Sequence, residues 1–150
     1  MKIINASLNL KEYKMMFKDP WNPTQKEIKK WAYSDEMEPV QDWELFIYKF
    51  ENIPMICTFV EDEQCEHTSY FLNTLYVFTG DTVRVGDSGK IQKLFQLLDT
   101  IENTTTSKEL KLWIERSQLL IEYPEYYESS YWGLCSKFVY ENNSGAIPKI

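Results

Sequence analysis

Two neighbouring stretches in the second half of the chain repeat apolar residues with the period of an α-helix. In the first stretch these residues fall at i, i+3, i+4, i+7 and i+10: Ile91, Leu94, Phe95, Leu98 and Ile101. In the second stretch one face collects Leu110, Trp113, Ile114, Ser117, Leu120 and Ile121. This spacing places each set on one side of a helix. Because only a short polar segment separates the two, we expect an antiparallel helical hairpin over residues 90–122.

Turn residues mark the ends of both predicted helices. The stretch from Gly86 to Gly89 precedes the first helix, and Pro124 follows the second, where proline cannot continue a helix. Between the helices, Thr106 and Glu109 have the spacing of a capping box, in which each side chain bonds the backbone N–H of the other residue. We therefore predict Thr106 as the N-cap of the second helix.

Helix signals in the first half of the chain are less regular. Thr24 and Glu27 form a second possible capping box after Pro23. The helix that follows turns three apolar residues inward: Ile28, Trp31 and Ala32. Beyond Pro39, a helical face fits Trp43, Phe46, Ile47 and Phe50. A strand also fits there, since Leu45 and Ile47 alternate.

Residues 53–60 and 70–83 are ambiguous, because both are rich in β-branched and aromatic residues, which favour strands. Residues 70–82 also carry two adjacent helical stripes, and a run of this length is long for a strand and ordinary for a helix. We therefore predict an all-α fold, an irregular helical array with antiparallel helical hairpins. The alternative is an α+β fold with a small antiparallel sheet from residues 43–83. Residues 1–141 are expected to form a single globular domain, and residues 142–150 a loop or disordered tail.

Charge is distributed unevenly along the chain. The whole chain has a net charge of −7, and residues 31–83 hold eleven acids against a single basic residue, Lys49. A concentrated negative field repels nucleic acids and anionic membranes and attracts basic proteins. We therefore expect a basic protein partner, and no direct binding of nucleic acid or membrane.

The cysteines and the apolar segments bear on the cellular compartment. Three cysteines make an odd count, whereas the disulfide framework of a small secreted protein uses an even number. The first ten residues lack the apolar core of a signal peptide, and no apolar stretch is long enough to span a bilayer. These features predict a cytoplasmic protein with reduced thiols.

Cys57, Cys65 and His67 are the residues that could carry metal or thiol chemistry. With a nearby acid they could supply the ligands of a zinc ion, but their spacing matches no common zinc module. A Cys–His nucleophile is disfavoured because the surrounding acids would raise the thiol pKa. We therefore expect no catalytic residue, no metal site and no cofactor, and a protein that is not an enzyme.

A second acidic and aromatic stretch runs from Glu122 to Trp132. No lysine or arginine occurs between Arg116 and Lys137, and five aromatic residues are interleaved with glutamates there. Tyrosine is common at binding hot spots because it offers a large rigid surface and a hydroxyl group, although each tyrosine taken singly could also cap the core. The candidate partner-binding residues are Asp35, Glu36, Glu38, Glu61, Asp62, Glu63, Glu66, Glu125, Tyr126, Glu128 and Tyr131.

Several short stretches are similar to those of small helical bacterial proteins: Pro23-Thr24…Glu27-Ile28…Trp31-Ala32-Tyr33, Gln41-Asp42-Trp43-Glu44-Leu45, Phe71-Leu72…Leu75-Tyr76…Gly80-Asp81…Val83-Arg84 and Trp113…Arg116-Ser117. Together with its size, acidity and aromatic content, the chain resembles the immunity proteins of contact-dependent growth inhibition and related polymorphic-toxin systems. The resemblance implies a non-catalytic protein that binds a cationic toxin domain and blocks its active site or substrate groove.

The expected function is therefore that of an immunity protein. It would neutralise a basic toxin domain, a nuclease at the C-terminus of a secreted toxin, because an acidic surface mimics the charge of nucleic acid. One alternative is a helical adaptor or scaffold without a toxin partner. A second is a small metal-dependent hydrolase that uses Cys65, His67 and nearby acids.

Overall fold

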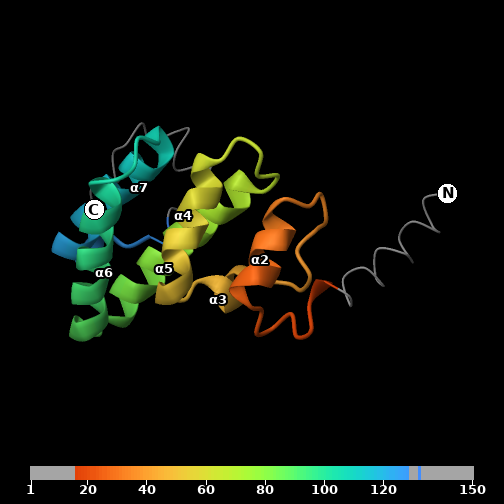
Figure 1. Cartoon of the computed structure of the whole chain (residues 1–150). Helices are drawn as coiled ribbons and strands as arrows, with labels where there is room; N and C mark the ends of the chain where they lie inside the picture. The colour runs from red at the N-terminus through yellow and green to blue at the C-terminus, as the bar shows by residue number, and fades with distance from the viewer. Residues whose placement is uncertain (1–15, 129–131, 133–150) are drawn as a thin grey trace.

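The computed structural model describes residues 16–128 and Trp132, and these residues form helices joined by loops, without a β-strand (Figure 1). The predicted all-α fold is confirmed, and the alternative sheet from residues 43–83 is wrong. The predicted tail over residues 142–150 lies outside the described residues. The helices are α2 (Gln25–Ala32), α3 (Glu44–Ile47), η1 (Phe50–Asn52), α4 (Ile53–Glu61), α5 (Thr68–Val85), α6 (Ser88–Glu102), α7 (Lys108–Glu122) and η2 (Pro124–Tyr126).

Helix α5 forms the centre of the fold, because its side chains are buried on almost every side. From Phe71 to Gly80, every residue except Asn73 is buried. A helix that is apolar all round has to be enclosed by other elements. Helices α3, α4, α6 and α7 each contact α5, and Figure 1 shows them gathered around it. This all-round burial explains why residues 70–83 lack a single amphipathic stripe. No described helix combines the length and apolarity needed to cross a bilayer.

Helices α6 and α7 form the hairpin that the two apolar stripes predict, but the N-cap of α7 lies one residue later than expected. Ser107, not Thr106, caps the helix: its Oγ accepts the backbone N–H of Leu110 at 3.2 Å and donates to Glu109 Oε2 at 3.1 Å. The reason lies two residues before Ser107, at Thr105, whose hydroxyl accepts the N–H of Ser107 at 3.1 Å. This bond fixes the turn so that Ser107 becomes the first capping position.

Phe95 was expected on the inner face of α6, and this prediction is wrong. Its side chain is 52% exposed, whereas Leu94, Leu98 and Ile101 are buried. Helix α6 lies at the outside of the bundle and packs mainly on α5 and α7, so its buried stripe is narrow. Phe95 is rotated by one residue, about 100°, from Leu94 and therefore faces outward.

Helix α2 begins as the sequence predicts. Thr24 Oγ1 accepts the N–H of Glu27 at 3.1 Å, and Glu27 Oε1 accepts the N–H of Thr24 at 2.9 Å, which completes the capping box. The helical face expected over residues 43–50 is only partly right, because α3 ends at Ile47. Asn52 donates its side-chain amide to Ile47 O at 3.0 Å, so a side chain takes the carbonyl that a continuing helix would use.

Three tryptophans in the core have almost no exposed surface, and each indole N–H has a partner. Trp31 donates to Met37 O at 3.0 Å, and Trp43 donates to Pro20 O at 2.8 Å. Trp113 donates to both Leu75 O and Thr79 Oγ1, at 3.1 and 3.0 Å. Because each tryptophan combines a buried ring with a directed bond, it fixes the element it meets in one position. Trp113 thereby attaches α7 to the middle of α5.

Arg116 on α7 is an exception to the satisfied core. Its side chain is 0% exposed, and Nε, Nη1 and Nη2 have no hydrogen-bond partner among the residues the structure describes. A buried charge without a partner is costly, because the guanidinium loses its hydration and gains nothing in return. Arg116 should therefore reduce the stability of this fold.

Truncation of the hairpin core should destabilise the protein in proportion to burial. Leu98→Ala or Ile114→Ala removes a side chain that is at most 1% exposed, and each should lower the free energy of unfolding by about 2–5 kcal/mol. The matched control is Phe95→Ala on the same hairpin, which should cost less than about 1 kcal/mol. Urea denaturation measures all three. Equal losses for Phe95 and Leu98 would contradict the packing of α6.

Replacing the buried guanidinium by an apolar side chain of similar length should stabilise the protein. Arg116→Met should raise the free energy of unfolding by about 1–4 kcal/mol, as apolar replacement of buried charges does. The control is Arg84→Met, whose side chain is 54% exposed and which should change stability by less than about 1 kcal/mol. Thermal and urea denaturation decide. A clear loss of stability in Arg116→Met would contradict this prediction.

Candidate functional site: an acidic face formed by two loops

Two loops that are distant in the sequence lie side by side at the N-terminal end of α5. The first follows α2 and the second joins α4 to α5. Glu66 donates its backbone N–H to Ala32 O at 3.0 Å, and the Cys65 thiol donates to the same oxygen at 3.2 Å. Tyr33 donates its hydroxyl to Asp62 Oδ2 at 2.7 Å. These bonds hold the two loops together as one surface.

Trp31 lies beneath this junction and contacts both loops. Its ring stacks on the imidazole of His67, with 3.7 Å between ring centroids and an angle of 10° between planes. The edges of Tyr70 and Phe71 meet the same indole at 5.1 and 5.7 Å. Since the indole N–H also binds Met37 O in the first loop, one buried side chain orients both loops.

The junction of the two loops carries the acids between residues 35 and 66 that the sequence analysis proposes as partner-binding residues. We call this surface the acidic face and define it by Asp35, Glu36, Glu38, Glu61, Asp62, Glu63 and Glu66. Asp35, Glu38, Glu63 and Glu66 are exposed, and none of these four carboxylates forms an ion pair with a basic side chain of the described residues. These four carboxylates therefore add negative charge to the surface without a basic side chain paired to them.

Two members of the acidic face also support its structure. Glu61 accepts the hydroxyl of Thr105 at 2.8 Å, which ties the end of α4 to the turn before α7. Asp62 accepts the Tyr33 hydroxyl and the N–H of Gln64, and the bond from Tyr33 in particular holds the pKa of Asp62 below its usual value. The same bond raises the pKa of Tyr33 to about 12, so its hydroxyl stays protonated and keeps donating.

The second group of candidate residues lies elsewhere. Glu125, Tyr126 and Glu128 follow the C-terminal end of α7, whereas Glu61 meets the turn before its N-terminal end. A helix of 15 residues separates these ends by roughly 22 Å. The structure therefore does not join this group to the acidic face, and Tyr131 lies outside the described residues.

Tyr126 and Tyr127 have neighbours that anchor the chain after α7. The rings of Tyr123 and Tyr126 stack with 5.1 Å between centroids, and Tyr126 is partly buried. Tyr127 and Trp132 approach Gly80 of α5 so closely that a Cβ atom there would lie 3.0 Å from each side chain. Packing therefore accounts for Tyr127 and Trp132, and in part for Tyr126.

The residues considered for metal or thiol chemistry have structural roles. Burial raises the pKa of the Cys57 thiol to about 12, which opposes formation of a thiolate. Cys65 donates to Ala32 O, and His67 stacks on Trp31. Within residues 16–128 and Trp132, no group of three or more His, Cys, Asp or Glu side chains is placed to hold a metal ion.

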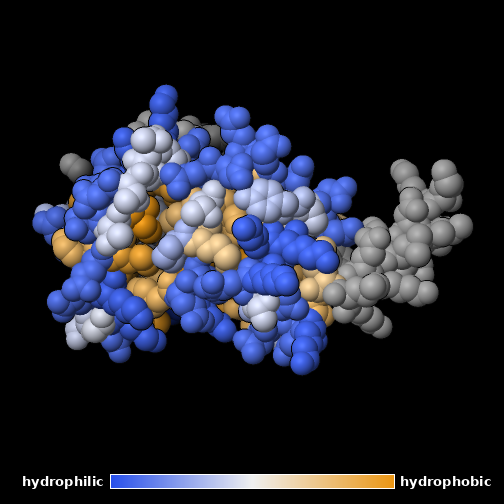
Figure 2. Space-filling model, in the orientation of Figure 1, coloured by the Kyte–Doolittle hydropathy of each residue, from blue (hydrophilic) through white to orange (hydrophobic). Residues whose placement is uncertain are grey.

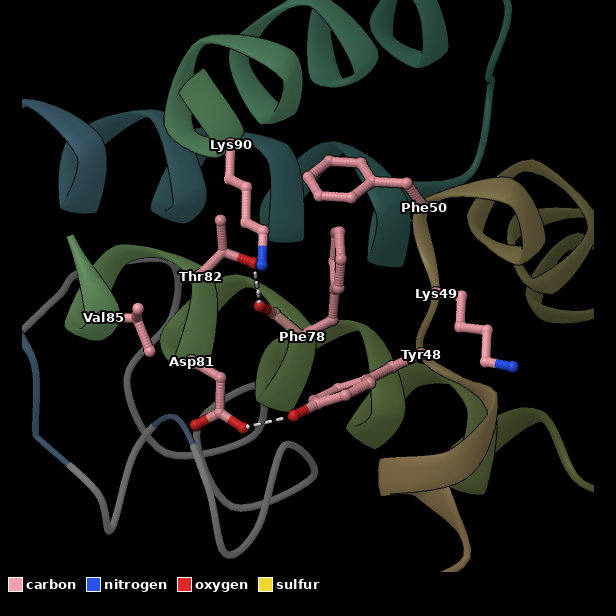
Figure 3. A pocket seen from close by; sticks show the side chains of 8 residues that line it. All are labelled: Tyr48, Lys49, Phe50, Phe78, Asp81, Thr82, Val85 and Lys90. Carbon is pink, nitrogen blue, oxygen red and sulfur yellow. Dashed lines mark hydrogen bonds between the residues drawn. The ribbon is translucent and has the colours of Figure 1, made fainter. Parts of the chain in front are cut away.

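A pocket at the opposite end of α5 was not found from the sequence. It has a volume of about 330 Å³, and six of its lining residues define it: Tyr48, Phe50, Phe78, Asp81, Val85 and Lys90 (Figure 3). Figure 2 shows that apolar side chains reach the surface of the molecule between α6 and α4. No sequence signal could have revealed this pocket, because its walls come from three separate segments that meet only in the fold.

Protonation of His67 should destabilise the fold. Burial lowers the pKa of His67 below its ordinary value of 6.5, so the unfolded chain binds its proton more readily than the folded one. Stability should therefore be lost as the pH falls through 6.5 towards the folded-state value. His67→Phe preserves a ring against Trp31 and removes this loss, and no other histidine contributes. Urea denaturation across this range measures the difference, and a wild type that gains stability over His67→Phe in acid contradicts the assignment.

No family model, curated protein or solved structure matches this chain. Its function has therefore to be inferred from the charge, exposure and geometry of its surfaces.

Proposed function

We propose that this protein is an immunity-type inhibitor that binds a basic toxin domain through the acidic face. The observation that carries this proposal is the junction of the two loops, where the bond from Glu66 N–H to Ala32 O joins acids from separate segments into one surface. Four of these acids are exposed and lack an ion pair within the described residues. Such a surface favours a cationic partner.

The acidic face is preorganised for binding. Its loops are held by backbone bonds, by the bond between Tyr33 and Asp62, and by the ring of Trp31. Loops that are already ordered lose little conformational entropy when they bind, so more of the interaction energy remains as affinity. The acids would also accelerate encounter with a basic partner by long-range attraction.

Apolar side chains lie among the acids and could anchor the partner. Met37 is 78% exposed and Tyr33 is 41% exposed, and both belong to the loop that carries Asp35, Glu36 and Glu38. Large flexible or aromatic side chains of this kind supply contact area at the centre of an interface. The surface thus combines steering charges with groups that slow dissociation.

The kind of toxin follows from the charge. A nuclease binds a polyanion, so its substrate groove is basic, and an acidic protein surface can occupy that groove in place of the phosphates. We therefore propose a nuclease domain as the partner and the cytoplasm as the place of action. Gene neighbourhood separates this function from that of an adaptor, because the gene beside this one should encode the toxin.

Charge reversal on the acidic face should weaken binding without unfolding the protein. The triple variant Asp35→Lys, Glu63→Lys and Glu66→Lys avoids Glu61 and Asp62, because those two carboxylates accept hydrogen bonds within the fold. It should slow association with the neighbouring gene's toxin domain by about tenfold or more at low salt. Stopped-flow kinetics at several salt concentrations measure the rate, and survival of cells that express the toxin measures protection.

The matched control changes the same charge elsewhere: Glu51→Lys, Asp99→Lys and Glu115→Lys, all at exposed positions. It should bind and protect nearly as well as the wild type. Circular dichroism should show both triple variants folded. Full protection by the Asp35, Glu63 and Glu66 variant, or no protection by the wild-type chain, would refute the proposal.

A further inference from the structure

The pocket between α5 and α6 has a rigid aromatic wall. The ring of Phe78 is only 3% exposed and meets the ring of Phe50 edge to face, with 4.9 Å between centroids. Tyr48 meets Phe78 in the same way at 6.1 Å, and its hydroxyl donates to Asp81 Oδ2 at 3.0 Å. These contacts hold the wall in place and leave an open space in front of it (Figure 3).

The charged group of the pocket that has no partner among the described residues is a cation, the ammonium of Lys90. Asp81 accepts a hydrogen bond from the Tyr48 hydroxyl and forms an ion pair with Arg84 at 3.3 Å, so its negative charge is partly neutralised by these two side chains. Lys90 extends from the first turn of α6 across the pocket, as Figure 3 shows. Its ammonium forms no hydrogen bond or ion pair with any described residue. Lys49 also lines the pocket, but its ammonium points away and donates to Asn22 Oδ1 at 3.2 Å.

A second lysine adds to the positive electrostatic potential near Lys90. The ammonium of Lys93 lies 4.7 Å from the centre of the Phe50 ring, on the same helix as Lys90. The chain as a whole carries a net charge of −7, so a cationic pocket is unusual on this protein. An aromatic wall beside an uncompensated ammonium selects for a flat ligand that carries a negative group.

We propose that this pocket binds a small aromatic carboxylate. The ring would lie between the wall formed by Phe50 and Phe78 and the side chain of Val85, and the carboxylate would meet the ammonium of Lys90. A volume of about 330 Å³ suits a molecule of one or two rings, since it lies at the lower end of known ligand sites. This site is separate from the acidic face and does not depend on the proposed toxin partner.

Three probes that share the indole ring system and differ in charge test the proposal: indole-3-acetate, an anion; 3-methylindole, which is neutral; and tryptamine, a cation. Calorimetric titration of the full chain should show indole-3-acetate binding about tenfold tighter than tryptamine, with 3-methylindole between them. Equal affinity for the three probes, or no measurable binding of indole-3-acetate, would overturn the proposal.

Two variants locate the binding. Lys90→Gln should reduce the affinity for indole-3-acetate to that of 3-methylindole and leave the neutral probe unaffected. Val85→Trp should weaken all three probes, because Val85 is 66% exposed at the edge of the pocket and a larger side chain would fill it. Lys111→Gln, at an exposed position on α7, is the control. If both pocket variants bind like the control, the proposal is wrong; if Val85→Trp fails to fold, Lys90→Gln decides alone.

Discussion

The burial of α5 on almost every side is the constraint on which the rest of the structure depends. A helix with apolar residues all round cannot lie on a surface, so the chain before and after it has to enclose it. The two candidate surfaces lie at its ends. The acidic face precedes Thr68, and the aromatic pocket reaches Val85. A helix of 18 residues places these ends roughly 27 Å apart, which would allow two independent binding events on one helical bundle.

Local patterns predicted the local structure, and tertiary contacts decided the remainder. The stripes of α6 and α7 identified the hairpin because helical periodicity needs no knowledge of neighbours. The cap of α7 shifted from Thr106 to Ser107 because Thr105 bonds both the N–H of Ser107 and distant Glu61. Phe95 was misplaced because the width of a buried stripe depends on how many helices cover it.

For the candidate sites too, the sequence predicted the local features and the tertiary contacts decided the rest. The excess of acid in the middle of the chain is visible in the sequence, but the bond between Glu66 and Ala32 that joins two acidic loops is not. The cationic pocket was missed because the overall acidity conceals a local group of lysines on α6. The burial of Arg116 was missed for a related reason, since an arginine among polar neighbours on a helix is normally exposed.

Gly80 has a consequence for how this fold can vary. Glycine inside a helix costs stability, because the unfolded chain gains freedom that alanine would not have. Here the absence of a side chain allows Tyr127 and Trp132 to approach the backbone of α5. The packing of Tyr127 and Trp132 on α5 thus depends on the absence of a side chain at Gly80. Gly80→Ala would favour the helix in isolation, but its new methyl group would press on Tyr127 and Trp132, so that side chains beyond α7 would have to shift to make room for it.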